Sequence, residues 1–169
     1  MLPVAILAGG LATRLRPITE TVPKALVEVA GRPFVAWQLR YLHSQGVSRV
    51  VLCVGYRGEQ IEAVVGDGSR YGLRVEYMFD GPRLLGTGGA LRRALPLVGH
   101  AFFVLYGDSF LPVNFSDVEK AFFSQGKPAL MTVQRNADQW DKSNVLFVDN
   151  VIVEYNKRAP KPSMSHIES

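Results

Sequence analysis

Short apolar runs alternate with segments of helical periodicity over the first two thirds of the chain. Apolar runs bounded by turn residues are typical of buried strands, and we predict strands at residues 3–8, 50–54 and 101–106. Residues 73–77 alternate as in a strand with one solvated face. Helices are predicted over residues 33–46, 59–65 and 91–95. Strands that alternate with helices predict an α/β fold, with a mixed, mostly parallel sheet covered on both faces.

The last third of the chain is predicted to add a helix and more strands. A helix is expected over residues 116–123 and a returning strand over residues 128–134. Residues 144–155 form two apolar runs around Asp149-Asn150, a pair suited to a two-residue hairpin turn. The tail after Lys157 holds little core-forming content and several prolines, so we expect it to be disordered.

Length and composition are those of one soluble globular domain, residues 1–169. The chain is 47% hydrophobic and 20% charged, which suffices for a proper core. No apolar run reaches the length of a membrane span, and Met1-Leu-Pro leads directly into the first strand, so the expected location is the cytoplasm. The net charge of +4 raises the question of nucleic acid, but the basic residues are scattered along the chain. Nucleic-acid binding is therefore a minor alternative.

A glycine-rich stretch after the first strand carries the strongest chemical signal. Gly9 and Gly10 end the strand where a backbone can pass close to a ligand, and Thr13, Arg14 and Lys24 follow. A hydroxyl, fixed positive charge and backbone N–H groups together suit polyphosphate oxygens. The spacing matches neither a P-loop nor the G-x-G-x-x-G dinucleotide pattern. A solvated surface turn is the alternative, and the joint occurrence of these residues favours a nucleotide site. Residues 24–30 are expected to be extended.

A second glycine-rich stretch, residues 80–90, leads into a helical pattern. Gly86, Gly88 and Gly89 would let the backbone approach a flat base, and free N–H groups at the helix start could donate to it. The alternative is an ordinary flexible loop. Asp108 follows the strand at residues 101–106, at a place where open α/β sheets bind ligands, and could hold a hard cation or simply end a turn.

The lone cysteine and the histidines give no sign of catalysis. Cys53 lies in the apolar run 50–54 and predicts a buried, inert thiol rather than a nucleophile. His43, His100 and His166 have no partner cluster, and we expect none of them to be catalytic.

These residues resemble the sugar-1-phosphate nucleotidyltransferases, whose signature is a glycine-rich strand end, G-x-x-T-R-L-x-P, then Pro-Lys. Gly10 to Pro17 and Pro23-Lys24 carry that pattern here. The chain is most similar to the guanylyltransferases of mannose 1-phosphate and glycero-manno-heptose 1-phosphate and to N-acetylmuramate 1-phosphate uridylyltransferase. The resemblance implies a Rossmann-like three-layer α/β/α fold of the nucleotide-diphospho-sugar transferase type.

The resemblance also implies roles for single residues. Arg14, Lys24 and Asp108 would be catalytic, with Asp108 holding Mg²⁺, and Lys157 would bind the sugar phosphate. Asn156 stands where the family usually has an acid. The residues expected to bind the nucleotide are Leu7, Ala8, Gly9, Gly10, Thr13, Arg14, Thr87, Gly88 and Gly89.

The activity that the resemblance implies is nucleotidyl transfer from an NTP, with GTP favoured over UTP or dTTP, to a sugar 1-phosphate. The product would be an NDP-sugar for cell-surface polysaccharide, and the sugar D-glycero-α-D-manno-heptose 1-phosphate or a related hexose 1-phosphate. Neither a membrane nor nucleic acid is an expected partner, and a homodimer stays open. Relatives continue with further strands and a second metal-binding aspartate, so this chain resembles an N-terminal portion that would bind NTP and turn over poorly. A non-catalytic regulatory module of the same fold is the alternative.

Overall fold

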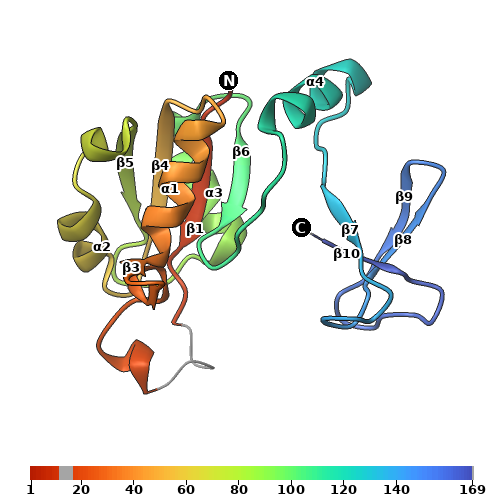
Figure 1. The fold of residues 1–169 in the computed structure, drawn as a ribbon, viewed down its shortest axis with the longest axis horizontal. Coiled ribbons are helices and arrows are strands. Elements are labelled where there is room, and N and C mark those ends of the chain that lie inside the picture. Colours follow the sequence, from red (N-terminus) through yellow and green to blue (C-terminus); the bar gives the residue numbers. More distant parts are fainter. Residues whose placement is uncertain (12–16, 169) are drawn as a thin grey trace. The chain divides into compact units, whose positions relative to one another are not determined.

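The computed structural model describes residues 1–11 and 17–168 (Figure 1). The chain divides into two compact units, unit 1 (Met1–Ser116) and unit 2 (Asp117–Ser169). Each unit has a sheet of its own. The single-domain assignment of residues 1–169 stays a prediction. Among the described residues, no helix has both the length and the apolar character that crossing a bilayer requires.

A four-stranded parallel sheet forms the centre of unit 1. Its strands are β1 (Val4–Ala8), β4 (Arg49–Val54), β5 (Arg74–Phe79) and β6 (Phe103–Tyr106). Their order is β5-β4-β1-β6, so β1 is a central strand. Val4 pairs with Val50 on one side and with Phe103 on the other. The strands predicted from the apolar runs are confirmed, with bounds shifted by one or two residues.

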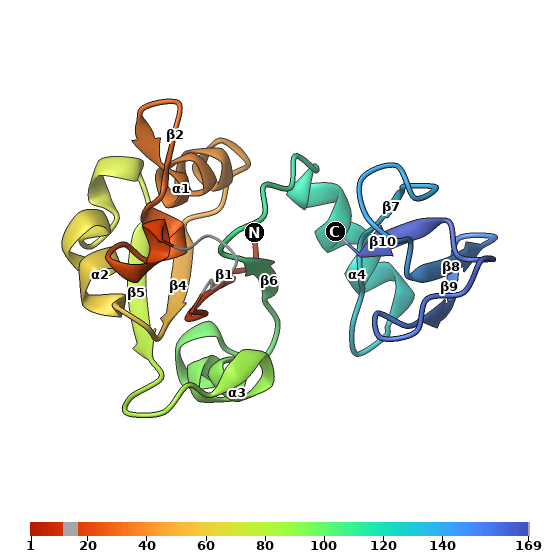
Figure 2. The ribbon, with the colours of Figure 1, turned by 90° about the horizontal axis from the view of Figure 1, so that it is seen from below.

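Helices cover both faces of this sheet, as Figures 1 and 2 show for α1 (Phe34–Ser44) and α3 (Gly86–Val98). Successive residues of a strand point to opposite faces, which produces two separate cores. In the first, Ile6 and Leu52 belong to one cluster with Leu39 of α1 and with side chains of α2 (Gly58–Val65). In the second, Val51 and Cys53 join Ala94 of α3. The predicted three-layer α/β/α fold is confirmed.

The segment between β1 and α1 differs from its prediction. Residues 24–30 were expected to be extended, but Lys24–Leu26 is the 3₁₀ helix η3, which follows η2 (Ile18–Glu20). The extended part shrinks to β2 (Glu28–Val29), which pairs with β3 (Arg32–Pro33) across a tight turn. Here Pro23, in extended conformation, precedes a turn closed by the hydrogen bond from Leu26 N–H to Pro23 O at 2.8 Å.

Unit 2 contains an antiparallel sheet ordered β7-β10-β8-β9, preceded in the chain by α4 (Phe115–Gln125). Its strands are β7 (Val133–Arg135), β8 (Val145–Val148), β9 (Val151–Tyr155) and β10 (His166–Glu168). Asp149 and Asn150 have φ values of 49° and 62°, as the predicted two-residue hairpin turn requires. The prediction of a strand over residues 128–134 is wrong for most of its length, because the paired strand β7 begins at Val133.

The prediction of a disordered tail after Lys157 is also wrong. The tail supplies β10, which pairs with both β7 and β8. Met164 is only 4% exposed and its sulfur accepts the Lys161 N–H at 3.4 Å. Pairing on both sides and one buried side chain therefore hold a segment whose composition alone predicts disorder.

Candidate functional site

A cavity of about 590 Å³ opens at the carboxyl ends of the parallel strands of unit 1. Its lining includes residues 7–11 at the end of β1, Gly86 and Thr87 at the start of α3, and the charged side chains of Lys24, Asp80 and Asp108. The chain leaves β1 toward β4 on one side, while β6 lies on the other. Open α/β sheets bind ligands in the crevice at such a switch point. The fold thus places the cavity where a ligand is expected.

The glycine at the end of β1 allows a close approach of backbone and side chains. A Cβ on Gly9 would lie 3.2 Å from both Asp80 Oδ2 and the Gly55 nitrogen. Gly107, after β6, is tighter still, because a Cβ there would lie 2.8 Å from the Leu7 carbonyl oxygen. Leu7, Ala8, Gly9 and Gly10 all line the cavity, as expected of nucleotide-binding residues, although that role stays a prediction. Thr13 and Arg14 lie outside the described residues.

Lys24 and Asp108 meet at the cavity although they lie far apart in the sequence. Lys24 Nζ donates to Asp108 Oδ2 at 2.5 Å, and both residues line the cavity. Their side chains are 38% and 42% exposed, so the pair contributes little to stability. Its effect is to hold one cation and one carboxylate at the same point of the cavity, where each is accessible to a charged ligand.

Gln38 supports the segment that carries Asp108, and the sequence analysis missed it. The side chain of Gln38 is buried on α1, and its Nε2 donates to Tyr106 O at 2.9 Å and to Ser109 O at 2.7 Å. These two carbonyls flank Gly107-Asp108, so the amide fixes the turn after β6. The sequence did offer a signal for Gln38, because it is a polar residue between Trp37 and Leu39 in the apolar helix predicted over residues 33–46.

Residues 86–90 of the second glycine-rich stretch are helical rather than a loop. α3 begins at Gly86, so Gly86 to Gly89 form its first turn. N–H groups in a first turn have no partner within the helix, which leaves donors beside the cavity. Gly86 and Thr87 line it, while Gly88 and Gly89 are not among its lining residues. Nucleotide contact by Thr87, Gly88 and Gly89 stays a prediction.

Asp80 is a second residue that the sequence analysis did not assign to the site. It follows β5, is 5% exposed, and its Oδ2 accepts the Leu85 N–H at 3.2 Å. Its backbone oxygen accepts from Arg93 Nη1 at 2.8 Å. The stretch Asp80-Gly-Pro is a common turn sequence, so nothing local marks its carboxylate as buried in a cavity.

Cys53 behaves as predicted. It is 1% exposed within β4 and is a free thiol at the cavity floor. Burial, and then the charge of Asp80, raise the pKa of Cys53 from 9.0 to about 11. A thiol in this state is a poor nucleophile at neutral pH, which confirms the assignment of Cys53 to the core.

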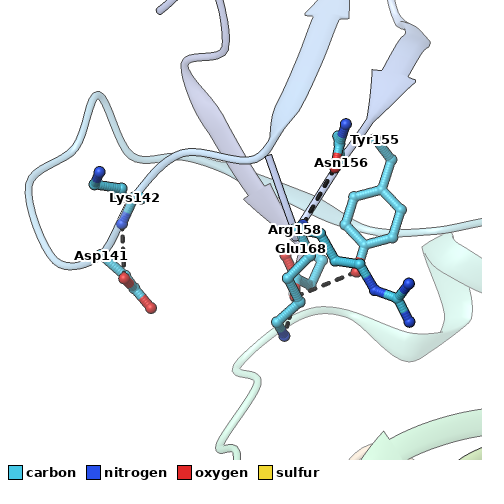
Figure 3. Close-up of polar contacts among 7 residues, drawn as sticks. Asp141, Lys142, Tyr155, Asn156, Arg158 and Glu168 are labelled. Atoms are coloured by element: carbon cyan, nitrogen blue, oxygen red, sulfur yellow. Dashed lines mark hydrogen bonds and ion pairs between the residues drawn. The ribbon is translucent and has the colours of Figure 1, made fainter. Parts of the chain in front are cut away.

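Lys157 belongs to unit 2 and forms an ion pair there. Its Nζ lies 2.5 Å from Glu168 Oε1 on β10. The Tyr155 hydroxyl also lies beside the Glu168 carboxylate (Figure 3), with its OH 3.5 Å from the same oxygen. Burial raises the pKa of the Glu168 carboxyl, but hydrogen bonds led by the one from Lys157 outweigh it and lower that pKa below its ordinary value. Asn156 Oδ1 accepts the N–H groups of Arg158 at 3.2 Å and Ala159 at 2.9 Å, so Asn156 stabilises the turn that carries Lys157. Sugar-phosphate binding by Lys157 stays a prediction.

No group of three or more His, Cys, Asp or Glu side chains suited to a metal occurs among residues 1–11 and 17–168. Mg²⁺ does not need such a group, since it usually binds one or two carboxylates together with substrate phosphates and water. Asp108, 42% exposed at the cavity, fits that mode.

Known proteins resemble this chain in sequence and in fold. A family model described as "Nucleotidyl transferase" matches residues 4–143. N-acetylmuramate alpha-1-phosphate uridylyltransferase of Neisseria meningitidis is 40% identical over 112 residues, which are 66% of this chain and 48% of that protein. D-glycero-alpha-D-manno-heptose 1-phosphate guanylyltransferase of Campylobacter jejuni is 31% identical over 158 residues, 92% of this chain and 68% of that protein.

Among solved structures, HddC from Yersinia pseudotuberculosis is similar with a TM-score of 0.75 and 26% identity, over 100% of this chain and 74% of that one. The chain thus spans about half to three quarters of the length of these relatives. The family match itself covers most of the chain, including the glycine stretches, Lys24 and Asp108. The chain therefore belongs to the nucleotidyl transferase family.

Proposed function

We propose that the chain transfers a nucleotidyl group from an NTP to a sugar 1-phosphate and releases pyrophosphate. The observation that carries this proposal is the Lys24–Asp108 pair in a glycine-rimmed cavity at the switch point of a parallel sheet. The Neisseria and Campylobacter relatives are both named as nucleotidyltransferases of sugar 1-phosphates, which supports the substrate class.

In the proposed reaction, an oxygen of the sugar phosphate attacks the α-phosphorus of the NTP. A new P–O bond forms while the bond to the β-phosphate breaks, and pyrophosphate leaves. The attacking oxygen is already anionic, so no general base is needed. The barrier lies in bringing two polyanions together and in the charge that develops on the leaving group. The described residues that line the cavity include a lysine and no histidine, which suits that requirement.

Each charged residue has a proposed task. Lys24 would neutralise phosphate oxygens, and Asp108 would hold Mg²⁺, which would supply further charge neutralisation at the phosphates. Gln38 would hold the Asp108 turn in place through the Tyr106 and Ser109 carbonyls. The residues at the end of β1 and the start of α3 would frame the nucleoside, with Arg14 and Thr13 assisting at the phosphates. Lys157 would bind the sugar phosphate.

We propose GTP as the preferred nucleotide and D-glycero-α-D-manno-heptose 1-phosphate or a related hexose 1-phosphate as the acceptor. The name of the Campylobacter relative and the structure of HddC with GMP-PN support guanine. The name of the Neisseria relative supports uracil instead. The nucleotide preference therefore has to be measured with both bases.

Pyrophosphate release tests the proposed function. The chain is mixed with Mg²⁺, each of GTP, UTP and dTTP, and heptose, mannose or glucose 1-phosphate, and each component is omitted in turn. The expected result is slow pyrophosphate release that needs all three components, as predicted for a chain that resembles an N-terminal portion of its relatives. Nucleotide binding by calorimetry without release in any mixture would instead favour the regulatory-module alternative.

A further inference from the structure

Two neighbouring side chains after β4, Tyr56 and Arg57, contact the segment that leads to Lys24. The backbone oxygen of Glu20, in η2, accepts two hydrogen bonds, from Tyr56 OH at 3.1 Å and from Arg57 Nη2 at 2.8 Å. Arg57 Nε also donates to the Tyr56 hydroxyl at 2.9 Å, and its guanidinium lies 5.3 Å from the centre of the Tyr56 ring. The two side chains therefore act on the Glu20 carbonyl as one unit, the Tyr56–Arg57 pair.

The backbone of the same turn contacts the chain where it leaves β1. Tyr56 N–H donates to the Gly9 carbonyl oxygen at 3.4 Å. A Cβ on Gly55 would lie 2.8 Å from that oxygen, so the two backbones approach closely. One turn thus touches the glycine-rich end of β1 and also the Glu20 carbonyl, on the way to Lys24.

Arg57 adopts a backbone conformation that few side chains tolerate. Its φ and ψ are 55° and 34°, in the left-handed region that favours glycine and asparagine. Such a residue persists where surrounding contacts compensate for the strain. The Gln60 amide, in the orientation that satisfies both of its ends, accepts from Arg57 Nη1 at 3.1 Å and donates to Thr21 O at 3.3 Å. The compensating contacts of Arg57 thus lie at the segment before Lys24.

Lys24 is anchored on both sides by different interactions. The next residue, Ala25, is 3% exposed and belongs to the first core of unit 1. On the other side, the Tyr56–Arg57 pair holds the Glu20 carbonyl. Neither residue of the pair is among the described residues that line the cavity, whereas Lys24 is. The pair is therefore placed to act on a ligand through Lys24 rather than directly.

Resting on the proposed function, we propose that Tyr56 and Arg57 are positioning residues for Lys24, the cation that meets the phosphates. The Lys24 side chain is 38% exposed, and ordering it against phosphate oxygens costs conformational entropy. A backbone that is already fixed lowers this cost. Loss of the pair frees the backbone before Lys24 and weakens the binding of a polyphosphate.

A merely structural role makes a different prediction. If the pair only stabilises unit 1, its removal lowers the melting temperature and leaves the NTP affinity of the folded chain unchanged. Arg57→Gly separates the two roles, because glycine removes the guanidinium and also relieves the left-handed backbone. Arg57→Gly should melt at a higher temperature than Arg57→Ala and bind NTP just as weakly.

Calorimetric titration with Mg²⁺ and each of GTP, UTP and dTTP, below the melting temperature of every variant, tests the proposal. Arg57→Gly, Arg57→Ala and Tyr56→Phe should each weaken binding about threefold to tenfold for every nucleotide that the wild type binds. In a Lys24→Ala background, Arg57→Gly should weaken binding by less than about twofold, because the residue that it positions is gone. Arg70→Ala is the matched control, since Arg70 also lies over a neighbouring ring, 5.0 Å from the centre of Tyr71 in η4 (Ser69–Tyr71).

Wild-type affinity in Arg57→Gly, or the same loss with and without Lys24, would overturn the proposal. Pyrophosphate release by the wild type would show that the proposed function survives such a result. Binding without release would overturn the proposed function, and weak binding by Arg57→Gly would still support the positioning role. Failure of every NTP to bind would overturn both. If binding by Lys24→Ala is too weak to measure, the affinities and melting temperatures of Arg57→Gly and Arg57→Ala decide alone.

Discussion

The two units differ in the kinds of side chain that they bury. In unit 1, β4 is buried at every residue after Arg49, and apolar clusters fill both faces of the sheet. In the described part of unit 2, Val145 and Met164 are the only buried apolar side chains, and they are outnumbered by the polar Asn136, Ser143 and Asn144. Hydrogen bonds of buried polar side chains replace apolar packing there. For example, Asn136 Nδ2 donates to Asp141 O at 2.6 Å.

Because of this difference, the candidate site residues of the two units are held in place by different interactions. Unit 1 places its cavity on a rigid parallel sheet, so the backbone that lines it is fixed by packing. Unit 2 places Lys157 on a turn held by Asn156 and by one ion pair. Apolar side chains of β9 remain exposed, with Val151 and Val153 each 60% exposed. We therefore expect changes in unit 1 to have the larger effects.

The largest expected effect is on catalysis. Asp108→Asn should lower Mg²⁺-dependent turnover about 100-fold or more, since the charge stabilisation at stake is several kcal/mol. The fold should survive, because the lost ion pair is exposed. Pyrophosphate release and thermal melting measure the two effects, and Asp117→Asn, at a surface ion pair with Lys120, is the control. Normal turnover in Asp108→Asn would remove Asp108 from the mechanism.

The next effect concerns packing in unit 1. Leu39→Ala deletes a fully buried side chain of α1 and should cost about 2–5 kcal/mol of unfolding free energy. Leu95→Ala, at a position of α3 that is 45% exposed, should cost well under half as much. Urea unfolding gives both values. Hydrogen exchange should show faster opening of β1 and β4 in Leu39→Ala, with less change in β8 and β9; equal acceleration in both sheets would mean that the units unfold together.

The third effect is a pH dependence in unit 2. Because the folded pKa of Glu168 is lowered from 4.5, its carboxylate stabilises the fold above that pH and the contribution is lost as the pH falls through the lowered value. The pKa of Asp138, lowered by hydrogen bonds from Ser143, acts in the same direction. Glu168→Gln should therefore reduce, without abolishing, the loss of stability on acidification.

Urea unfolding at pH 7 and pH 3.5, followed by Trp140 fluorescence in a Trp37→Phe background, measures this dependence. Glu154→Gln, which removes another lysine ion pair of the same unit, with Lys161 at 2.7 Å, is the control. An identical pH response in wild type and Glu168→Gln would show that the Glu168 carboxylate does not stabilise unit 2.

The smallest effect is the slow reaction of the Cys53 thiol with a thiol reagent in the native chain. With a pKa of about 11, roughly one thiol in a thousand is ionised at pH 8, and burial blocks access as well. A thiol reagent should therefore label the native chain very slowly and the urea-unfolded chain at once. Since Cys53 is the lone cysteine, its labelling reports the opening of unit 1 alone. Rapid labelling of the native chain would show that the cavity floor is open.

The sequence predicted unit 1 better than unit 2 for a physical reason. An apolar run such as residues 50–54 predicts a buried strand from its own composition. The tail that forms β10, by contrast, becomes ordered only through pairing with distant strands. The glycines at the start of α3 have low helix propensity, so local sequence favoured a loop and tertiary context overrode it.

The candidate site was partly predictable for the same reason. Lys24 and Asp108 each stood in a recognisable motif, but no spacing in the sequence reveals that their side chains meet. Gln38 and Asp80 are ordinary residues in their local segments. Their roles depend on the carbonyls of Tyr106 and Ser109 and on the approach to Gly9, which exist only in the folded chain.

The central position of β1 also bears on how the chain folds. Val4 has to pair with Val50 and with Phe103, so β1 leaves the ribosome before either of its neighbours and has to wait for both. Contacts between such distant residues make folding slow. Until β6 is complete, the apolar edge of β1 is available to other chains. Chaperone binding to a nascent chain should thus persist until residues 103–106 have left the exit tunnel.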